Sequence, residues 1–291
     1  MVDWAASTGQ SVLQLLPIND TTMTGTWEDS YPYNANSTFA LHPQFLHLPH
    51  VGELKDKEAM AEFEALGKVK GYIVNVADNK VVTAAYQQVC EECGHVDILI
   101  NCAGIITSNK TFDQVPEEEI VRTININTIA PMFVARAMLP DMLKRNQGHI
   151  CNIASAGGML GNPKMSVYAA SKWAATGWSD SVRIELEEMK SNVHVTTVAP
   201  YYINTGMFDG VKSRIIPILK PEYVCKRVIR AIEKNTRFRG IPFGFHFIRF
   251  CQAILPTTIF DFIFGKVVGI YHAMDEFTGR KKAGTGTSKA S

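Results

Sequence analysis

The chain has 291 residues, of which 46% are apolar and 20% are charged, enough to bury a substantial core in one α/β domain. Its formal net charge of +1 gives no strong basic field, which argues against a nucleic-acid partner. The six cysteines stand at irregular positions and do not form the pattern of a disulfide framework. The C-x-x-C pair of Cys90 and Cys93 has no further ligands nearby, so we expect two reduced thiols and no metal site.

The N-terminal segment, residues 1–50, differs in composition from the rest of the chain. No Lys or Arg occurs before Lys55, and Thr, Ser, Asn, Tyr and Pro are frequent. The apolar run at 11–18 is too short to span a bilayer, and no basic residue precedes it as in a signal peptide. We expect this segment to be poorly ordered, mostly loop with one short helix. An N-terminal strand–helix unit is therefore predicted to be atypical or absent.

From Val51 onward, segments with helical periodicity alternate with short apolar runs. Asp78 is placed to cap a helix, and the run 95–101 is typical of a central parallel strand. The alternation predicts an α/β domain over 51–240 with a doubly wound, mostly parallel sheet. Helices are predicted at 53–66, 78–93, 117–146 and 167–190, and strands at 70–76, 95–101, 149–154 and 193–199.

The C-terminal region, residues 241–280, is unusually aromatic, because eight of the fifteen Phe lie between Ile241 and Phe277. Charged residues interrupt its apolar run and Pro256 divides it, so it does not form one membrane-spanning helix. Three interpretations are open: a helical lid over an apolar substrate pocket, an interface in a homodimer, or an interfacial membrane anchor. We favour a lid that also associates with a membrane. Residues 281–291 are rich in Gly, Ser and Lys and are expected to form a disordered tail.

Three residues near the middle of the chain can meet at one point. Ser155 follows the predicted strand 149–154, at the carboxyl end where open α/β sheets place their ligands. Tyr168 and Lys172 are four residues apart on the next predicted helix, so their side chains leave the same face. An ammonium near a phenol favours the phenolate, so Tyr168 can exchange a proton with an alcohol or a carbonyl while Ser155 hydrogen-bonds the reacting oxygen. This Tyr–Lys spacing often arises by chance on a surface helix, but Ser155 thirteen residues upstream favours a catalytic site.

These three residues, together with NCAG at 101–104 and PYYINTGMF at 200–208, resemble the short-chain dehydrogenase/reductase family from about Val51 to the C-terminus. The resemblance implies a Rossmann-like fold, with NAD or NADP as the cofactor. It also implies that Asn127 completes the catalytic set with Ser155, Tyr168 and Lys172. The role implied for Asn127 is to hold a water that links the Lys to solvent.

The resemblance further implies a set of cofactor contacts. Lys172 hydrogen-bonds the nicotinamide ribose and acidifies Tyr168, so that both residues contact the cofactor. Asn101 ties neighbouring strands together, and the small residues after it let the backbone approach the adenosine. The other contacts expected on the adenine, adenosine and carboxamide sides are Asn75, Val76, Ala103, Gly104, Pro200, Ile203 and Thr205.

The P-Y-x-x-x-T-G-M-F form of the motif at 200–208 resembles the branch of retinol dehydrogenases and 17-beta-hydroxysteroid dehydrogenases. Members of that branch act on lipophilic alcohols, which implies a lipophilic small-molecule substrate here. An apolar lid suits such a substrate, because most of its binding free energy comes from burying hydrocarbon. The resemblance also implies an intracellular protein, either associated with endoplasmic reticulum or lipid-droplet membranes or cytoplasmic.

One motif of the family is missing from the sequence. Its members open with T-G-x-x-x-G-x-G between a strand and a helix, where the backbone receives the pyrophosphate. The nearest matches here, at 7–9 and 24–25, lack the later glycines. Two hypotheses follow. The chain is an NAD(P)-dependent oxidoreductase of lipophilic alcohols, or it is a truncated or divergent, catalytically impaired member that acts only as a binding or membrane-associated partner.

Overall fold

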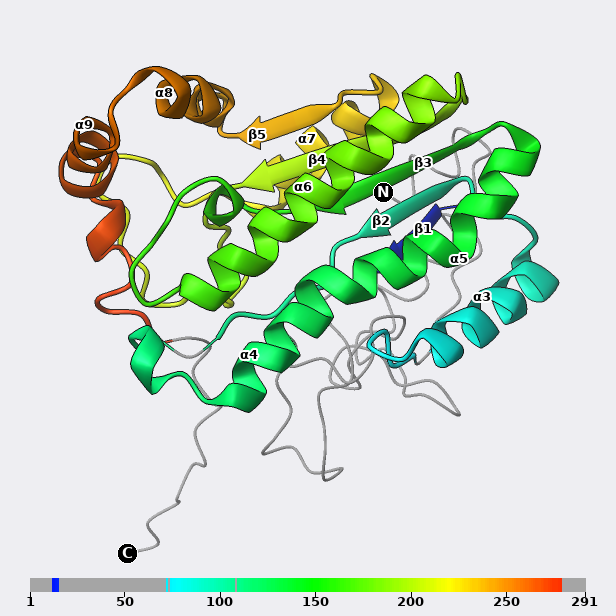
Figure 1. The fold of residues 1–291 in the computed structure, drawn as a ribbon, viewed down its shortest axis with the longest axis horizontal. Coiled ribbons are helices and arrows are strands. Elements are labelled where there is room, and N and C mark those ends of the chain that lie inside the picture. Colours follow the sequence, from blue (N-terminus) through cyan, green and yellow to red (C-terminus); the bar gives the residue numbers. More distant parts are fainter. Residues whose placement is uncertain (1–11, 16–71, 73, 108, 279–291) are drawn as a thin grey trace, which may run out of the picture.

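The computed structural model describes residues 12–15, 72, 74–107 and 109–278 of the chain. Its five strands form one sheet in the order β1-β2-β3-β4-β5, and every neighbouring pair is parallel. Parallel neighbours need crossover connections, and helices provide them after β2 (Figure 1). The predicted α/β fold with a parallel sheet is confirmed. The strands are β1 (Val12–Leu15), β2 (Ile98–Asn101), β3 (Gly148–Ile153), β4 (Val193–Pro200) and β5 (Phe238–Ile241).

Two hydrophobic cores lie on opposite faces of the sheet. Leu99 belongs to the core that holds the apolar side chains of two helices, α3 (Asn79–Cys93) and α5 (Ala130–Arg145). Its neighbours Ile98 and Ile100 belong to the core that contains the apolar face of α7 (Pro221–Glu233). Successive side chains of a strand point to opposite faces, so this division shows that helices cover both sides of the sheet.

The predicted helices from Asp78 onward are present. The Asp78 carboxylate accepts hydrogen bonds from Lys80 N (2.9 Å) and Val81 N (3.4 Å), which caps α3 as expected. The long helix predicted at 117–146 consists of α4 (Glu117–Ile124), a π-helical turn (Asn125–Ile129) and α5. The helix predicted at 167–190 is α6 (Ser166–Glu188), which runs across β3 and β4 in Figure 1. The helix predicted at 53–66 and the tail at 281–291 lie outside the described residues.

Two short stretches in the first part of the chain differ from what the sequence predicts. Residues 12–15 form β1, a strand inside the segment expected to be mostly loop with one short helix. The edge of β2 offers unpaired N–H and C=O groups, and this short run pairs with them. Residues 72 and 74–76, predicted as part of a strand, belong to none of the five described strands. A local turn forms there instead, since the Asn75 carbonyl accepts from Asp78 N (3.1 Å) and its side-chain oxygen accepts from Ala77 N (3.1 Å).

The C-terminal region forms short helical pieces after β5. They are a 3-10 helix (Phe243–Phe247), α8 (Ile248–Ile254), α9 (Thr257–Asp261), a π-helical turn (Phe262–Val267) and a 3-10 turn (Ile270–His272). Within the described part of the chain, no helix combines the length and apolar character needed to cross a membrane.

The end of this region is tied to the loops that follow β2, β3 and β4. Asn109 Nδ2 donates to the Met274 carbonyl at 2.8 Å. Lys164 pairs with Asp275 at 3.1 Å, and the Thr278 amide donates to the Asp209 carbonyl at 3.0 Å. These contacts hold the C-terminal pieces over the carboxyl edge of the sheet.

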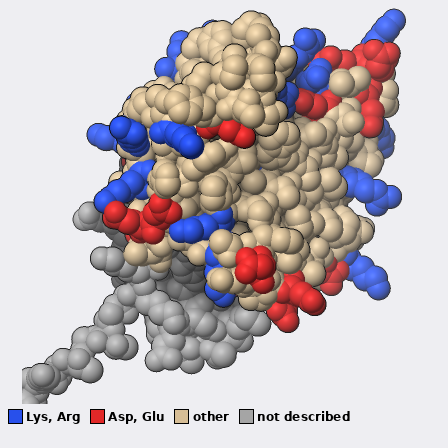
Figure 2. Space-filling model, turned by 60° about the vertical axis from the view of Figure 1, so that its left-hand side comes forward, with Lys and Arg blue, Asp and Glu red and all other residues tan. Residues whose placement is uncertain are grey.

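A group of aromatic and aliphatic side chains on the outside of these pieces is exposed, and we call it the aromatic face. Figure 2, which brings the side of α8 and α9 forward, shows broad stretches of uncharged surface there. Large exposed apolar clusters are uncommon on soluble monomers unless they contact something. The members are Phe243, Phe247, Phe250, Ile254 and Phe262, with exposed fractions of 53–65%.

Candidate active site

Ser155 lies where the sequence placed it, two residues beyond the end of β3. It caps a 3-10 turn, and its hydroxyl oxygen accepts a hydrogen bond from Gly157 N at 3.1 Å. The small residues of this loop let α6 begin close to the sheet. Gly158 packs directly against α6, because a Cβ there would stand 2.7 Å from the Lys172 carbonyl oxygen. The loop therefore brings Ser155 to the first turns of α6.

Tyr168 lies in those first turns and is buried, with 4% of its surface exposed. Its ring makes an edge contact with Phe208, at 6.2 Å between centroids. Burial raises the pKa of the Tyr168 phenol to about 12, and a hydrogen bond with Ser155 opposes this rise. The phenol therefore carries its proton at neutral pH. That state differs from the expectation that Lys172 acidifies it.

Lys172 explains the difference. Its ammonium lies 5.9 Å from the centroid of the Tyr168 ring and donates a hydrogen bond to the Ile153 carbonyl at 3.0 Å. Burial lowers the pKa of this ammonium to about 8, so it is still mostly charged at neutral pH. Desolvation is thus the largest cause of the pKa shift of both groups in this structure.

Asn127 lies on the π-helical turn and is also buried. Its amide nitrogen donates to the Ile105 carbonyl (2.8 Å) and the Ser171 hydroxyl (2.9 Å), and its oxygen accepts from Ile105 N (2.8 Å). The side chain thus fixes the loop after β2 against α6. Gly104, in that loop, contacts both polar groups, because a Cβ there would stand 3.1 Å from Lys172 Nζ and 3.3 Å from Asn127 Oδ1.

The residues expected to contact a cofactor separate into two groups. Asn101 Nδ2 donates to Asn152 Oδ1 at 2.8 Å and so links β2 to β3, as predicted for it. Buried Ala103 follows it, and Pro200 ends β4 with Ile203 and Thr205 in the next loop, where Ile203 bridges to Leu219. All of these stand at the carboxyl edge of the sheet. Asn75 and Val76 instead lie just before α3. Neither group lines the two cavities near Tyr168.

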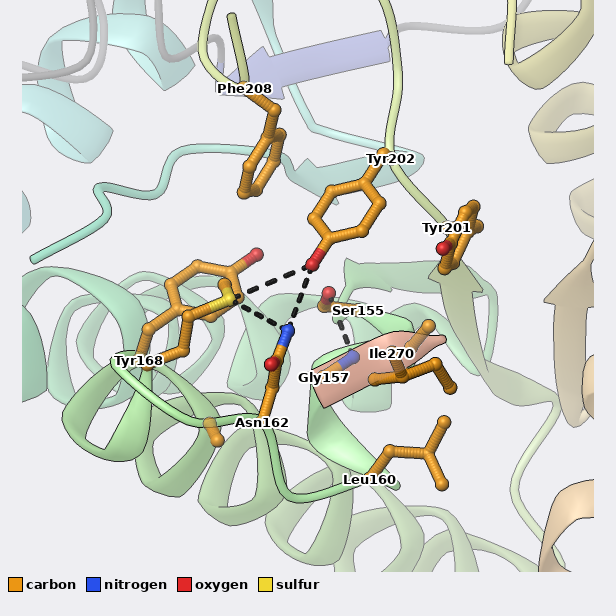
Figure 3. A pocket seen from close by; sticks show the side chains of 12 residues that line it. Ser155, Gly157, Leu160, Asn162, Tyr168, Tyr201, Tyr202, Phe208 and Ile270 are labelled. Carbon is orange, nitrogen blue, oxygen red and sulfur yellow. Dashed lines mark hydrogen bonds between the residues drawn. The ribbon is translucent and has the colours of Figure 1, made fainter. Parts of the chain in front are cut away.

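A small pocket opens above Ser155 and Tyr168. Its volume is about 40 Å³, and its walls are mostly apolar and aromatic (Figure 3). Tyr202 contributes a hydroxyl that accepts from Asn162 Nδ2 at 3.0 Å. Sequence reasoning missed most of this wall, although PYY directly after a predicted strand was a usable signal, since ligands bind beyond the carboxyl ends of parallel strands. The missed lining residues are Leu160, Asn162, Tyr201, Tyr202, Phe208 and Ile270.

The residues at this edge fit the nicotinamide ribose end of a dinucleotide. A lysine ammonium carries three N–H donors, and within the described residues that of Lys172 donates one hydrogen bond, to the Ile153 carbonyl. Two donors therefore remain for the hydroxyls of a ribose. Gly104 and Ala103 leave the backbone beside Lys172 free of bulky side chains. No group of His, Cys, Asp and Glu that could hold a metal occurs in the described residues.

Comparison with known proteins gives the same assignment as the site. The family model of short chain dehydrogenases matches residues 51–215. A model of 4-alpha-glucanotransferases matches residues 1–95, less than half of the chain, and does not reach Ser155, Tyr168 or Lys172.

Three relatives cover most of this chain and at least two thirds of their own. Epidermal retinol dehydrogenase 2 of Mus musculus is 34% identical over 82% of this chain and 81% of its own. Retinol dehydrogenase 10-B of Danio rerio is 33% identical over 77% and 68%. Estradiol 17-beta-dehydrogenase 11 of Pongo abelii is 31% identical over 69% and 67%. The chain therefore belongs to the short-chain dehydrogenase/reductase family, in the branch of the retinol and hydroxysteroid dehydrogenases.

Proposed function

We propose that this chain is an NAD(P)-dependent oxidoreductase that interconverts a lipophilic alcohol, retinol-like or hydroxysteroid-like, and its carbonyl. The observation that carries the proposal is the contact of the Tyr168 phenol with Ser155 at the floor of an apolar pocket, one helical turn from Lys172. The relatives support the substrate class, since their names specify retinol and estradiol.

Each residue of the site has a separate role in the reaction. When bound, the cofactor supplies or accepts the hydride. Tyr168 gives its phenolic proton to the oxygen of a carbonyl substrate, or takes a proton from an alcohol in the reverse direction. The Ser155 hydroxyl donates a hydrogen bond to that same oxygen. Lys172 holds ribose hydroxyls with its two remaining donors, and a charged ammonium there lowers the cost of forming the phenolate.

The raised pKa of Tyr168 bears on the direction of the reaction. With a pKa of about 12 the phenol is almost fully protonated at neutral pH, the state that donation to a carbonyl requires, but it is a weaker acid than an ordinary phenol. Oxidation of an alcohol requires the phenolate, so it depends more strongly on Lys172 staying charged.

The central test uses Tyr168→Phe. This variant removes one hydroxyl, so we expect turnover of retinol or estradiol to fall by about a hundredfold to ten-thousandfold, with the melting temperature almost unchanged. Tyr223→Phe is the matched control, because Tyr223 is 40% exposed on α7 and lines neither cavity near Tyr168. Full turnover by Tyr168→Phe would overturn the assignment.

The second hypothesis, an impaired member, is favoured by the missing glycine-rich motif. Titration of NADH and NADPH against the melting temperature separates the two hypotheses. Binding tighter than about 100 μM, equivalent to roughly −5.5 kcal/mol, supports the enzyme. An unchanged melting temperature at millimolar cofactor supports a role as a binding or membrane-associated partner only.

Membrane association is part of the same proposal. The aromatic face presents five large apolar side chains on the outside of the C-terminal pieces, which suits the surface of the endoplasmic reticulum or a lipid droplet. A second copy of the chain covering this face, as a homodimer, remains the other prediction for it.

A further inference from the structure

A second cavity lies beside the pocket of Ser155 and Tyr168. Its volume is about 360 Å³, against about 40 Å³ for the inner pocket. The two cavities share three lining residues, Leu160, Asn162 and Ile270. These three side chains therefore lie at the junction between the pocket of the reacting groups and a larger space, which we call the outer cavity.

The volumes show that the inner pocket alone is too small for a lipophilic substrate. A space of about 40 Å³ has room for only a few water-sized groups, since one water needs roughly 10–15 Å³ of such space, so it holds little more than the reacting carbinol. Sites for small organic ligands usually have volumes of about 300–1,000 Å³, and the outer cavity falls within that range. The remaining carbon atoms of such a substrate need the outer cavity.

The walls of the outer cavity suit hydrocarbon. Phe260 and Phe264 stack there with their ring centroids 4.4 Å apart. The Tyr271 hydroxyl bonds to the Asp261 carboxylate, which gives the cavity one polar edge. Burying hydrocarbon against the stacked rings contributes about 25 cal/mol per Å².

The shared residues are held in place in two ways, Asn162 by hydrogen bonds and Leu160 and Ile270 by burial in the core. Asn162 is fixed by hydrogen bonds from its amide to the Tyr202 hydroxyl (3.0 Å) and the Met165 sulfur (3.3 Å). Leu160 and Ile270 have apolar side chains that face each other in Figure 3, one from the loop after β3 and the other from the C-terminal region. This pair therefore lies at the junction of the two cavities, and Ile270 is the member that comes from the same C-terminal region as the stacked rings.

We propose that the outer cavity holds the tail of an elongated lipophilic alcohol whose carbinol reaches Tyr168, and that Ile270 determines the length of substrate accepted. This inference rests on the proposed function and adds the shape of the substrate to it. A long-chain primary alcohol such as hexadecanol uses both cavities, whereas butanol uses mainly the inner one.

The test compares kcat/KM for hexadecanol and butanol. Ile270→Trp fills the junction, so the hexadecanol-to-butanol ratio should fall by about tenfold or more. Ile270→Ala removes bulk and should raise the same ratio, which keeps the test valid if the larger side chain prevents folding. Ile259→Trp is the control, because Ile259 is 47% exposed on α9 and lines neither cavity. An unchanged ratio in both Ile270 variants would overturn the proposal.

A binding measurement separates this inference from the proposed function. Retinol is itself an elongated lipophilic alcohol, and its own fluorescence, excited directly, reports binding without turnover. We expect Ile270→Trp to weaken retinol binding by about tenfold and Ile259→Trp to leave it unchanged. If the chain shows no turnover and Ile270→Trp still weakens retinol binding, the outer cavity is supported and the proposed enzyme activity is refuted. Equal binding by the two Trp variants would refute the outer cavity.

Discussion

At the scale of single residues, Gly104 determines how closely the loop after β2 approaches Lys172 and Asn127. A Cβ at this position would stand 3.1 Å from Lys172 Nζ and 3.3 Å from Asn127 Oδ1, closer than ordinary contacts. In Gly104→Ala the end of the flexible lysine side chain has to move by a few tenths of an ångström. We expect kcat/KM to fall by about tenfold to a hundredfold, because small displacements of catalytic groups are costly, with little change in the melting temperature.

Gly177→Ala is the matched control for this variant. Gly177 lies on α6, the same helix as Lys172, and an added Cβ there meets nothing within 4 Å. Replacing a helical Gly by Ala stabilises by about 0.5–1 kcal/mol, so the control should keep its activity and melt slightly higher. If Gly104→Ala has the activity of the control, the close approach has no role in catalysis.

The residues of the site were predictable to different degrees, for a physical reason. Ser155, Tyr168 and Lys172 could be placed from the sequence, since a strand end and a four-residue helical spacing fix their geometry locally. Asn162 and Ile270 could not, because they reach the pocket from irregular segments more than a hundred residues apart. No local sequence pattern predicts that these two residues line the same pocket. The raised pKa of Tyr168 could not be predicted either, because it comes from burial in the folded chain.

At the scale of elements, the helices and the buried strands could be predicted from the sequence, whereas the edge strands of the sheet could not. The helix at 167–190 and the run at 95–101 have long or strongly apolar patterns. In contrast, β5 has only four residues, FRGI, with a charge and a glycine inside it. The strand β1 exists only because β2 offers it an edge. Pairing with a neighbouring strand is a tertiary interaction, and it can override the intrinsic secondary-structure preference of a short segment.

The aromatic face gives the prediction at this scale. Each large apolar side chain that leaves water contributes up to about 1.5–3 kcal/mol, so Phe247→Ser with Phe250→Ser should weaken binding to phosphatidylcholine vesicles by more than about tenfold. Cosedimentation with the vesicles measures this loss. Because the attraction is apolar, added salt should change it little.

Phe112→Ser is the control for the vesicle experiment. Phe112 is 63% exposed, like Phe247 and Phe250, but it lies on a 3-10 turn before α4. It should leave vesicle binding intact. Equal losses in the control and the double variant would show that exposure alone, and not the aromatic face, drives the association.

At the scale of the whole molecule, the two ends of the parallel sheet have different tasks. The carboxyl ends of β2, β3 and β4 carry the site, and the contacts of residues 273–278 fasten the loops around it. The opposite end carries buried polar groups that take no part in the proposed reaction. His149, near the start of β3, is 6% exposed, and its Nε2 lies 2.8 Å from the Thr196 hydroxyl on β4.

His149 makes the stability of the fold depend on pH. Burial lowers its pKa to about 4, and the nearby His194 contributes to the same effect, while a hydrogen bond with Asn235 opposes it. In the unfolded chain a histidine titrates near its ordinary pKa of about 6.5. At pH values between about 4 and about 6.5, this histidine is protonated in the unfolded chain but stays neutral in the folded chain. The free energy of unfolding therefore falls as the pH drops through this window, by up to about 3 kcal/mol from this group.

Urea unfolding at several pH values from about 7 to about 4 tests this dependence. His149→Gln removes the titrating ring but keeps an amide that can bond the Thr196 hydroxyl, so it should lower stability at neutral pH and flatten the loss on acidification. Carboxylates also lose stability in acid, but they are common to both chains, so the difference in slope isolates His149. Identical slopes for the wild type and His149→Gln would mean that the buried ring does not set the acid limit of the fold.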